Sequence, residues 1–375
     1  MQQAGNVSVP VAALFLNFKR SIYGRFFFVF ACVSFAPLRI FVLAVQYGIM
    51  SKTVLITGAA GFIGSHLTRS LLADGANVIG IDNESTGRRE NIAELLDNSN
   101  FQYVCSDAGD ESVLSDLASD VDEVYHLAAA VGVALVAADP VRTIQTNIDL
   151  TQTLLRVLER RNRVRPVKLY FASTSEVYGR NPARIWSEDD ELVYGPTTIG
   201  RWSYGLSKAI DEHLVLAYVR QFGLSAVIGR FFNVVGARQT GQYGMVLPRF
   251  VSAALKNAPL TVFDDGAQRR CFIHVSDVVK IIRELVSKSD NSGQIYNIGS
   301  SESISILDLA KKVIAQTGSK STIEFLPSTA VYGENFEDCR WRTPDVSKLF
   351  SAIEYRPKFS LSDAISDIVE SISNE

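Results

Sequence analysis

Three glycines, each three residues from the next, separate an apolar run from an amphipathic run in the segment VLITGAAGFIGSHL of residues 54–67. Gly58 can adopt the positive φ that a tight turn needs, and Gly61 lets backbone N–H groups approach a pyrophosphate at the start of a helix. Gly64 lets that helix pack closely against the strand. The segment therefore predicts a nucleotide-binding strand, turn and helix.

The kind of nucleotide follows from the residues that stand about 20 positions further on, where such folds place an acidic side chain on the ribose. A second apolar run, residues 77–81, ends in Asp82 and Asn83. The Asp82 carboxylate would accept a hydrogen bond from a ribose 2′-OH and would repel a 2′-phosphate, so the sequence predicts NAD rather than NADP. Arg88 and Arg89 are close enough in the sequence to keep NADP as the alternative.

Short apolar runs alternate with helical patterns from residue 52 to about residue 230. Such alternation predicts a parallel sheet with helices on both faces. The fold class is therefore α/β, a Rossmann-type doubly wound parallel sheet that binds its cofactor at the C-terminal ends of the strands. The predicted strands are Val54–Thr57, Val78–Asp82, Phe101–Cys105, Val124–Leu127, Val167–Ala172 and Ala226–Arg230.

The alternation loosens after Phe231, which indicates a smaller C-terminal substrate-binding α/β region. We therefore expect an NAD-binding Rossmann domain over residues 50–230 and a substrate-binding region over residues 231–375, with the two parts of the chain interleaved. The expected elements of the second part are strands at Leu260–Phe263, Gln294–Ile298 and Ile323–Phe325 and helices near 246–256, 276–287 and 305–317.

The composition limits the classes of partner. The chain has 375 residues and a net charge of −3, and residues 1–49 hold four basic residues and no acidic one, which leaves 33 basic against 40 acidic side chains in the rest. This acidic balance argues against a nucleic-acid surface. The four cysteines form no CxxC pair, so the sequence predicts neither a disulfide framework nor a metal site and suits a reducing, cytoplasmic location.

Residues 1–49 differ from the rest of the chain because they are basic and strongly apolar. One hypothesis is an anchor, with membrane association at the inner face through residues 26–48, although Arg39 within such a span would cost about 2.5–3.5 kcal/mol. A cleaved signal peptide is a less natural alternative, because a cytoplasmic cofactor site follows directly. The third is a mis-assigned start, since Met50 stands just before the first predicted strand.

Two further groups of residues carry the chemistry. The sequence STSEVYG of residues 173–179 follows an apolar run, so its hydroxyls and the Glu176 carboxylate would emerge at the C-terminal end of a strand, where open α/β sheets bind ligands. Tyr204 and Lys208 are four residues apart at the start of a predicted helix, so they share one helical face. A neighbouring ammonium favours a phenolate, which predicts that Lys208 lowers the pKa of Tyr204 and makes it a general base.

In this order, the glycine turn, the acidic residue after the second strand, the Ser/Thr group and the YxxxK spacing resemble the extended short-chain dehydrogenase/reductase family of NAD-dependent nucleotide-sugar epimerases, dehydratases and decarboxylases. The resemblance covers about residues 52–370. It implies that Asp107 holds the adenine, that Leu127–Ala129 line the cofactor, and that Asn233, Arg270 and Arg342 meet the diphosphate of the sugar nucleotide. It also implies a homodimer formed through helices near 147–160 and 205–220.

The predicted site follows from these motifs and the resemblance together. The expected catalytic residues are Thr174, Glu176, Tyr204 and Lys208. The expected cofactor-binding residues are Gly58, Gly61, Phe62, Ile63, Gly64, Asp82, Asn83, Asp107, Ala108, Leu127, Ala128, Ala129, Tyr204 and Lys208. The expected substrate-binding residues are Ser175, Asn233, Arg249, Arg270 and Arg342. His66, His126 and His274 have no partner at metal-ligand spacing and are expected to be structural.

The resemblance implies a first step in which Tyr204 takes the proton of the sugar O4, Thr174 hydrogen-bonds that oxygen and NAD accepts a hydride from C4. The 4-keto product can then lose CO₂, lose water or be reduced on its other face. Thr174-Ser175-Glu176 resembles UDP-glucuronate decarboxylases and GDP-mannose 4,6-dehydratases, and Arg201-Trp202-Ser203-Tyr204 resembles the decarboxylases. Decarboxylation of UDP-glucuronate to UDP-xylose or its 4-keto form is therefore the leading hypothesis. The alternatives are a 4-epimerase or 4,6-dehydratase of a UDP-, GDP- or dTDP-hexose and, more remotely, a non-catalytic NAD-binding protein.

Overall fold

A parallel sheet forms the centre of the protein, for which the computed structural model describes residues 51–132, 139–242, 244–333 and 337–374. Within these residues the sheet has seven strands in the order β11-β6-β5-β4-β1-β2-β3, and every neighbouring pair runs parallel. The six strands predicted before residue 231 are confirmed to within two residues at each end. The seven strands are β1 Thr53–Thr57, β2 Asn77–Asp82, β3 Phe101–Cys105, β4 Glu123–His126, β5 Lys168–Thr174, β6 Ser225–Phe231 and β11 Ile295–Ile298.

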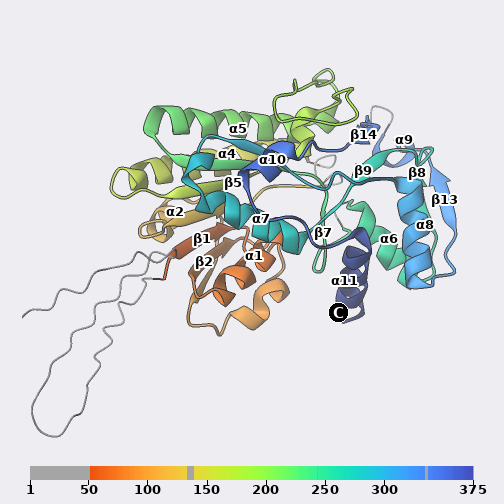
Figure 1. Ribbon diagram of the computed structural model, residues 1–375, viewed down its shortest axis with the longest axis horizontal. Coiled ribbons are helices and arrows are strands. Elements are labelled where there is room, and N and C mark those ends of the chain that lie inside the picture. The colour runs from red at the N-terminus through yellow and green to blue at the C-terminus, as the bar shows by residue number, and fades with distance from the viewer. Residues whose placement is uncertain (1–50, 133–138, 243, 334–336, 375) are drawn as a thin grey trace, which may run out of the picture. The chain divides into compact units, whose positions relative to one another are not determined.

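Helices cover both faces of the sheet (Figure 1). Because successive side chains of a strand point to opposite faces, Val54 and Ile56 of β1 pack in one core and Leu55 packs in the other. The first core includes α1 (Phe62–Ala73) and α7 (Val275–Ser287). The second core includes α2 (Glu111–Leu117), α4 (Pro140–Asn162) and α5 (Ser203–Phe222). The doubly wound fold class is thereby confirmed.

Local sequence signals define the ends of these helices. The side chain of Asp139 accepts a hydrogen bond from the Arg142 N–H at the start of α4, and Pro140 occupies the first turn, where it costs no hydrogen bond. Gly223 ends α5 in the left-handed conformation with φ of 64°, which a glycine adopts without strain. These two helices lie side by side along one face of the sheet, as Figure 1 shows.

The part of the chain after residue 231 does not form a separate region as a whole. Gln294–Ile298 was expected in the substrate-binding region, but β11 pairs with β6 and completes the central sheet. The expectation that the two parts interleave agrees with this pairing. A third core gathers apolar side chains from α6 (Val246–Leu255), β8 (Leu260–Phe263), α8 (Ile306–Thr317) and α11 (Leu361–Ser373), away from the central sheet.

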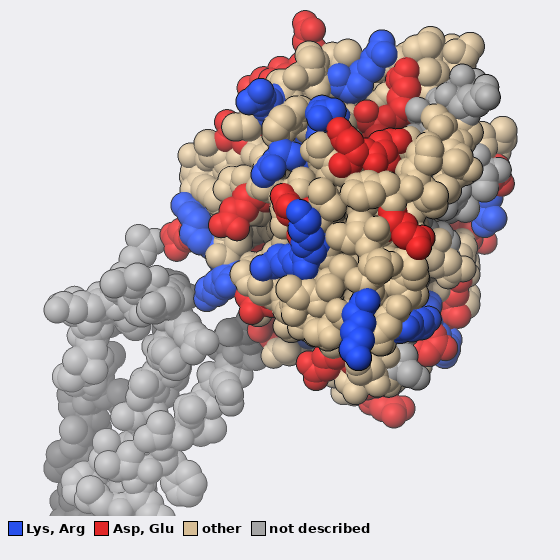
Figure 2. All heavy atoms as spheres, turned by 90° about the vertical axis from the view of Figure 1, so that its right-hand side faces the viewer, with Lys and Arg blue, Asp and Glu red and all other residues tan. Residues whose placement is uncertain are grey.

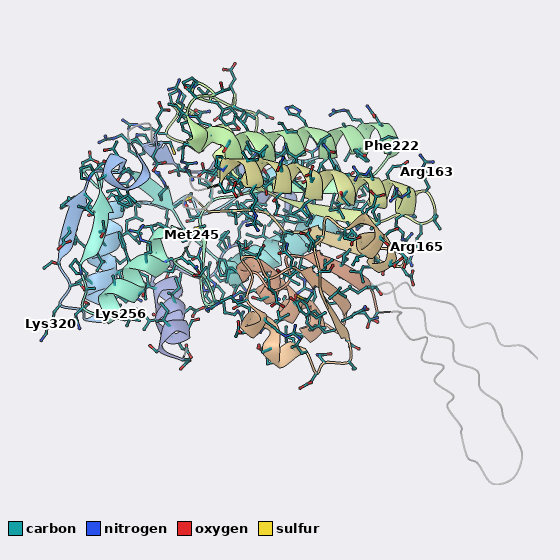
Figure 3. The ribbon with its side chains drawn as sticks, turned by 180° about the vertical axis from the view of Figure 1, so that it is seen from behind. Arg163, Arg165, Phe222, Met245, Lys256 and Lys320 are labelled. Atoms are coloured by element: carbon teal, nitrogen blue, oxygen red, sulfur yellow. The ribbon has the colours of Figure 1, made fainter. Side chains whose placement is uncertain are left out.

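Figure 3 shows Met245, directly before α6, between the central layers and this third core, at whose far end Lys256 and Lys320 lie. Figure 2 shows basic and acidic side chains mixed across the face on that side of the molecule. Within the described part of the chain, no helix is long and apolar enough to span a bilayer. The hypotheses about residues 1–49 fall outside the described residues.

The remaining elements are short. The small strands pair as β13 with β8, β10 with β7, and β12-β9-β14. They are β7 Val234–Val235, β9 Arg269–Cys271, β10 Ile273–His274, β12 Ser303–Ser305, β13 Ile323–Leu326 and β14 Trp341–Arg342. The short helices are α9 Thr329–Tyr332 and α10 Ser347–Ala352, with 3₁₀ turns η1 Arg89–Leu95, η2 Ser175–Tyr178, η3 Gly200–Trp202 and η4 Ser289–Asn291.

Candidate active site

A cavity of about 650 Å³ opens at the C-terminal ends of the central strands. It is lined by every residue of the predicted site except Lys208, which is buried beside it. Residues from the glycine turn after β1, the ends of β4 and β5, the start of α5 and the loops around α6 and β9 thus meet in one place. This is the position that open α/β sheets use for ligands.

The glycine turn fits a dinucleotide. Gly58 has φ of +77°, and a Cβ there would lie only 2.9 Å from the backbone nitrogen of Ala128. A Cβ on Gly64 would lie 2.0 Å from the carbonyl oxygen of Gly58, so glycine is required where α1 approaches the turn. Gly61 caps α1 without any side-chain hydrogen bond, and the first turn of this 12-residue helix holds no acidic residue. The N–H groups of its first turn and its positive dipole end suit a pyrophosphate.

Asp82 stands at the end of β2 beside this turn and lines the cavity. Its carboxylate accepts hydrogen bonds from the N–H groups of Ala60 at 3.0 Å and Glu84 at 2.8 Å, so it also fixes the glycine turn. Burial raises the pKa of Asp82 above its ordinary value. Close by, the Asn83 amide donates to the Asp107 carboxylate at 3.0 Å. Contact of these residues with the ribose and the adenine stays a prediction.

Thr174 and Tyr204 both line the part of the cavity where β5 ends and α5 begins. We call this part the reacting end of the cavity. The Thr174 hydroxyl accepts a hydrogen bond from the Glu176 N–H at 3.2 Å at the end of β5, and Tyr204 lies in the first turn of α5. Burial raises the pKa of the Tyr204 phenol, and the Glu176 carboxylate acts in the same direction, whereas hydrogen bonding with Thr174 lowers it. The net direction is upward, so the expected lowering is wrong for this arrangement.

The Lys208 ammonium is itself close to a carboxylate. Its ammonium lies 3.3 Å from the carboxylate of Asp211, one turn further along α5, and 4.0 Å from the centre of the Phe171 ring. Burial lowers the pKa of Lys208, and the Asp211 carboxylate raises it. The cation that the sequence places beside Tyr204 is therefore paired with an anion.

Glu176 lies between two arginines. Arg201 contacts both oxygens of its carboxylate, at 2.6 Å and 2.9 Å, and Arg342 donates a hydrogen bond to it at 2.5 Å. The three side chains are between 7% and 11% exposed. Burial alone would raise the pKa of Glu176, but the two guanidinium charges hold it well below its ordinary value. Glu176 is therefore a carboxylate and a weak base.

Three further substrate-binding residues were expected: Arg270 and Asn233, which with Arg342 were expected at the diphosphate, and Arg249. Arg270 lies next to the arginines of Glu176, because all three guanidinium groups lie within 4 Å of the Asp338 carboxylate. Arg270 donates to the Asp338 carboxylate at 2.7 Å, and the Asn233 amide donates to the carbonyl oxygen of Cys271 at 2.8 Å. The Arg249 guanidinium lies 5.3 Å from the centre of the Phe263 ring. All three residues line the cavity, as does Arg342. Contact of Asn233, Arg270 and Arg342 with a diphosphate stays a prediction, as does contact of Arg249 with the substrate.

Two charged residues that pair with predicted catalytic groups, Arg201 and Asp211, were absent from that prediction. Arg201 precedes Tyr204 by three positions and Asp211 follows Lys208 by three, so both share a helical turn with a catalytic side chain. This spacing could have indicated both. No spacing predicts the approach of Arg342 to Glu176, because 166 positions separate them.

A doubly wound sheet with an open glycine turn, an acidic residue after the second strand and a tyrosine at the cavity defines the class of NAD-dependent dehydrogenase-like enzymes. The family model described as "NAD dependent epimerase/dehydratase family" matches residues 54–299. The chain belongs to this family. It is an NAD-dependent enzyme that modifies a nucleotide sugar.

Individual relatives match most of the chain. UDP-N-acetyl-alpha-D-glucosaminuronate decarboxylase of Bacillus cytotoxicus is 38% identical over 322 residues, which span 86% of this chain and 98% of that protein. UDP-glucuronic acid decarboxylase 1 of Danio rerio is 33% identical over 325 residues, 86% of this chain and 73% of that protein. The solved structure of UDP-glucuronic acid 4-epimerase from Bacillus cereus, in complex with UDP-glucuronic acid and NAD, superposes with a TM-score of 0.76 at 34% identity and covers 86% of this chain and 99% of that one.

Proposed function

We propose that the protein decarboxylates a UDP-hexuronate, with UDP-glucuronate as the leading substrate and UDP-xylose or its 4-keto form as the product. The observation that carries this proposal is the pair of guanidinium groups, Arg201 and Arg342, at the reacting end of the cavity. Together with Arg270 they set three guanidinium groups against two carboxylates, Glu176 and Asp338, so one positive charge is left over. This excess suits a sugar that carries a carboxylate at C6, because arginine binds carboxylates in a bidentate manner. A hydroxymethyl group would offer them no charge.

The relatives support the same substrate class. Two of them are named decarboxylases of UDP-linked uronates, and the solved epimerase binds UDP-glucuronic acid. The two decarboxylases differ in their named substrates by an N-acetyl amino group on the sugar. UDP-N-acetylglucosaminuronate therefore belongs in any test beside UDP-glucuronate.

In the proposed mechanism, NAD held by the glycine turn and Asp82 would supply the hydride acceptor and donor for C4 of the sugar. Tyr204 accepts the O4 proton, and the Thr174 hydroxyl hydrogen-bonds that oxygen. The 4-keto sugar that results is a β-keto acid, which loses CO₂ readily. Glu176 is held as a weak base by its two arginines, so it serves to orient the substrate. The same weakness disfavours dehydration, which would need Glu176 to remove the C5 proton.

Epimerisation at C4 is the second candidate, because the Bacillus cereus neighbour is named as an epimerase of the same uronate. The two reactions share the oxidation step and differ in whether the carboxylate survives. Incubating the protein with NAD⁺ and UDP-, GDP- or dTDP-sugars, the two UDP-uronates included, and reading the product masses separates loss of CO₂, loss of water and no change. A product that keeps the carboxylate and differs only at C4 would overturn decarboxylation.

We also propose a homodimer formed through α4 and α5. Val141 and Ile144 of α4 and Ile210 of α5 are 63%, 38% and 47% exposed, and a second copy could cover them. Sedimentation of the wild-type protein and of Ile210→Glu tests this. A monomeric wild-type protein would overturn the proposal.

Location and membrane contact are further proposals. We propose that the enzyme works in the cytoplasm, where NAD is available, and that residues 26–48 attach it to the inner face of the membrane if that segment is an anchor. A chain that begins at Met50 should then remain soluble and bind NAD, whereas the full chain should require detergent. A full chain that is soluble without detergent would overturn the anchor.

A further inference from the structure

Asp211 is a buried carboxylate to which the proposed mechanism gives no part. It lies on α5, three residues after Lys208, and its side chain is completely buried. The Lys208 ammonium, 3.3 Å away, is 2% exposed. A buried ion pair of this kind is weak evidence for stability, because desolvation of the two charges offsets their attraction. A functional role therefore has to be considered.

Asp211 is the carboxylate in direct contact with Lys208. Glu212 also raises the pKa of Lys208, but its own carboxylate accepts two hydrogen bonds from Arg230, at 3.0 Å and 2.8 Å, and one from Ser173 at 2.5 Å. From the sheet, β5 presents the uncharged Phe171 ring.

Two other elements, β4 and α4, pack against the Lys208–Asp211 ion pair. His126 of β4 has its pKa lowered to about 3, by burial first and then by the Lys208 charge, so it is neutral at any working pH. From α4, Thr151 lies beside Asp211, and its hydroxyl donates a hydrogen bond to the carbonyl oxygen of Asn147 at 3.0 Å. Neither element brings a second charge to the ammonium. Asp211 is thus the carboxylate in direct contact with Lys208 that raises the pKa of its ammonium.

The pair also acts on the candidate base. Tyr204 lies one turn before Lys208 on the same helix, and the negative charge of Asp211 contributes to raising the phenol's pKa, as do Glu176 and burial, against the Arg201 charge. Asp211 therefore influences both members of the Tyr204–Lys208 couple. Asp211 does not line the cavity.

We propose that Asp211 is a positioning residue that holds the Lys208 ammonium in place, keeps it protonated and thereby sets the pH range in which Tyr204 can accept the O4 proton. This inference rests on the proposed function in one respect, that Tyr204 is the base. The active form of the couple has a phenolate and an ammonium, so activity falls on the acid side as Tyr204 gains a proton and on the alkaline side as Lys208 loses one.

The direction in which the pH profile should shift follows from the negative charge of Asp211. A negative charge favours the protonated form of each neighbour, so replacing Asp211 by a neutral amide lowers both apparent pKa values of the couple. Both limbs of the pH profile should move toward acid. Burial raises the pKa of Asp211 itself to about 6. Below that pH the wild-type carboxyl is neutral too, so the wild-type and amide profiles should converge there.

The experiment compares kcat against pH for the full chain and for Asp211→Asn, with saturating UDP-glucuronate and NAD⁺. We expect both limbs of the variant to shift to lower pH by about one unit. Asp211→Glu, which restores the charge, should return the limbs toward their wild-type positions. Asp149→Asn, which removes an exposed carboxylate from α4, is the matched control and should leave the profile unchanged. If Asp211→Asn does not fold, Asp211→Ser takes its place, since the smaller side chain leaves room for water beside the ammonium.

A second measurement needs no turnover. The ionisation of Tyr204 can be followed by ultraviolet absorbance with NAD⁺ bound, as the difference between each protein and its Tyr204→Phe counterpart, and it should occur at lower pH in Asp211→Asn. Lower kcat at every pH with unmoved limbs and an unmoved phenol titration would overturn the role of Asp211. Near-normal turnover in Tyr204→Phe would instead overturn the proposed function. The two failures are therefore distinguishable.

Discussion

Arg342 donates a 2.5 Å hydrogen bond to the Glu176 carboxylate, although 166 positions separate the two residues. Glu176 follows the central strand β5, and Arg342 belongs to β14, which pairs with β9 in a small sheet. The contact therefore joins the nucleotide-binding sheet to the C-terminal elements at the reacting end of the cavity. It also places a guanidinium group in the lining of the cavity, beside Glu176.

The first prediction concerns Arg342→Gln. The variant should reduce the preference of the enzyme for binding UDP-glucuronate over UDP-glucose by about ten- to a hundredfold, because one charge-assisted hydrogen bond contributes about 1.5–3 kcal/mol. Calorimetric titration of both sugar nucleotides in the presence of NAD measures this. Arg340→Gln is the control, because Arg340 is exposed and pairs with Asp265 at 3.3 Å. An equal loss for both sugars would instead assign Arg342 to the diphosphate.

The second prediction concerns stability against pH. Arg201 and Arg342 hold the pKa of Glu176 below its ordinary value of 4.5, so Glu176 contributes stability that is fully present above that pH. The contribution should decline as the pH falls below 4.5 toward the lower pKa of the folded state. Urea unfolding of wild type and Glu176→Gln should show a constant difference from neutral pH down to about pH 5 and a shrinking difference below it. A difference that grows on acidification would contradict the assigned ionisation.

Much of the fold could be predicted because the signals are local. The runs that became β1 to β6 are apolar, short and bounded by turns, and Gly58 and Gly64 stand where only glycine fits. The place of Ile295–Ile298 could not be predicted in the same way. Its partner strand, β6, lies more than 60 positions earlier in the chain. An apolar pattern predicts a strand but does not indicate which other strand it will pair with.

The candidate site, too, could be predicted only as far as its signals are local in the sequence. The cavity gathers the residues that the glycine turn and the strand ends predict, but the charges around them come from other parts of the chain. The expectation that Lys208 lowers the pKa of Tyr204 considered one neighbour and left out Asp211. A pKa depends on burial and on every nearby charge, so a spacing rule for two residues could not give its direction.

The third prediction concerns the base. Tyr204→Phe should lower kcat by about 10²–10⁴-fold, because it removes the proton acceptor and leaves the ring packing in place. NAD binding, followed by fluorescence titration, should largely survive. Tyr218→Phe, a change of the same kind further along α5, should leave turnover near the wild-type value and serves as the control. Near-normal turnover in Tyr204→Phe would remove Tyr204 from the mechanism.

The last prediction concerns the choice of cofactor. The carboxylate of Asp82 lines the cavity and is fixed by the N–H groups of Ala60 and Glu84, so a 2′-phosphate placed beside it would meet a negative charge with little room to move. The wild-type protein should therefore bind NAD more tightly than NADP. Asp82→Asn keeps an oxygen that can accept hydrogen bonds but removes the charge, so it should weaken NAD binding and strengthen NADP binding. Asp82→Ala should weaken NAD further, because it also frees the glycine turn. Fluorescence titration of the three proteins with both dinucleotides checks the order, and tighter binding of NADP by the wild-type protein would show that the assignment of NAD through Asp82 is wrong.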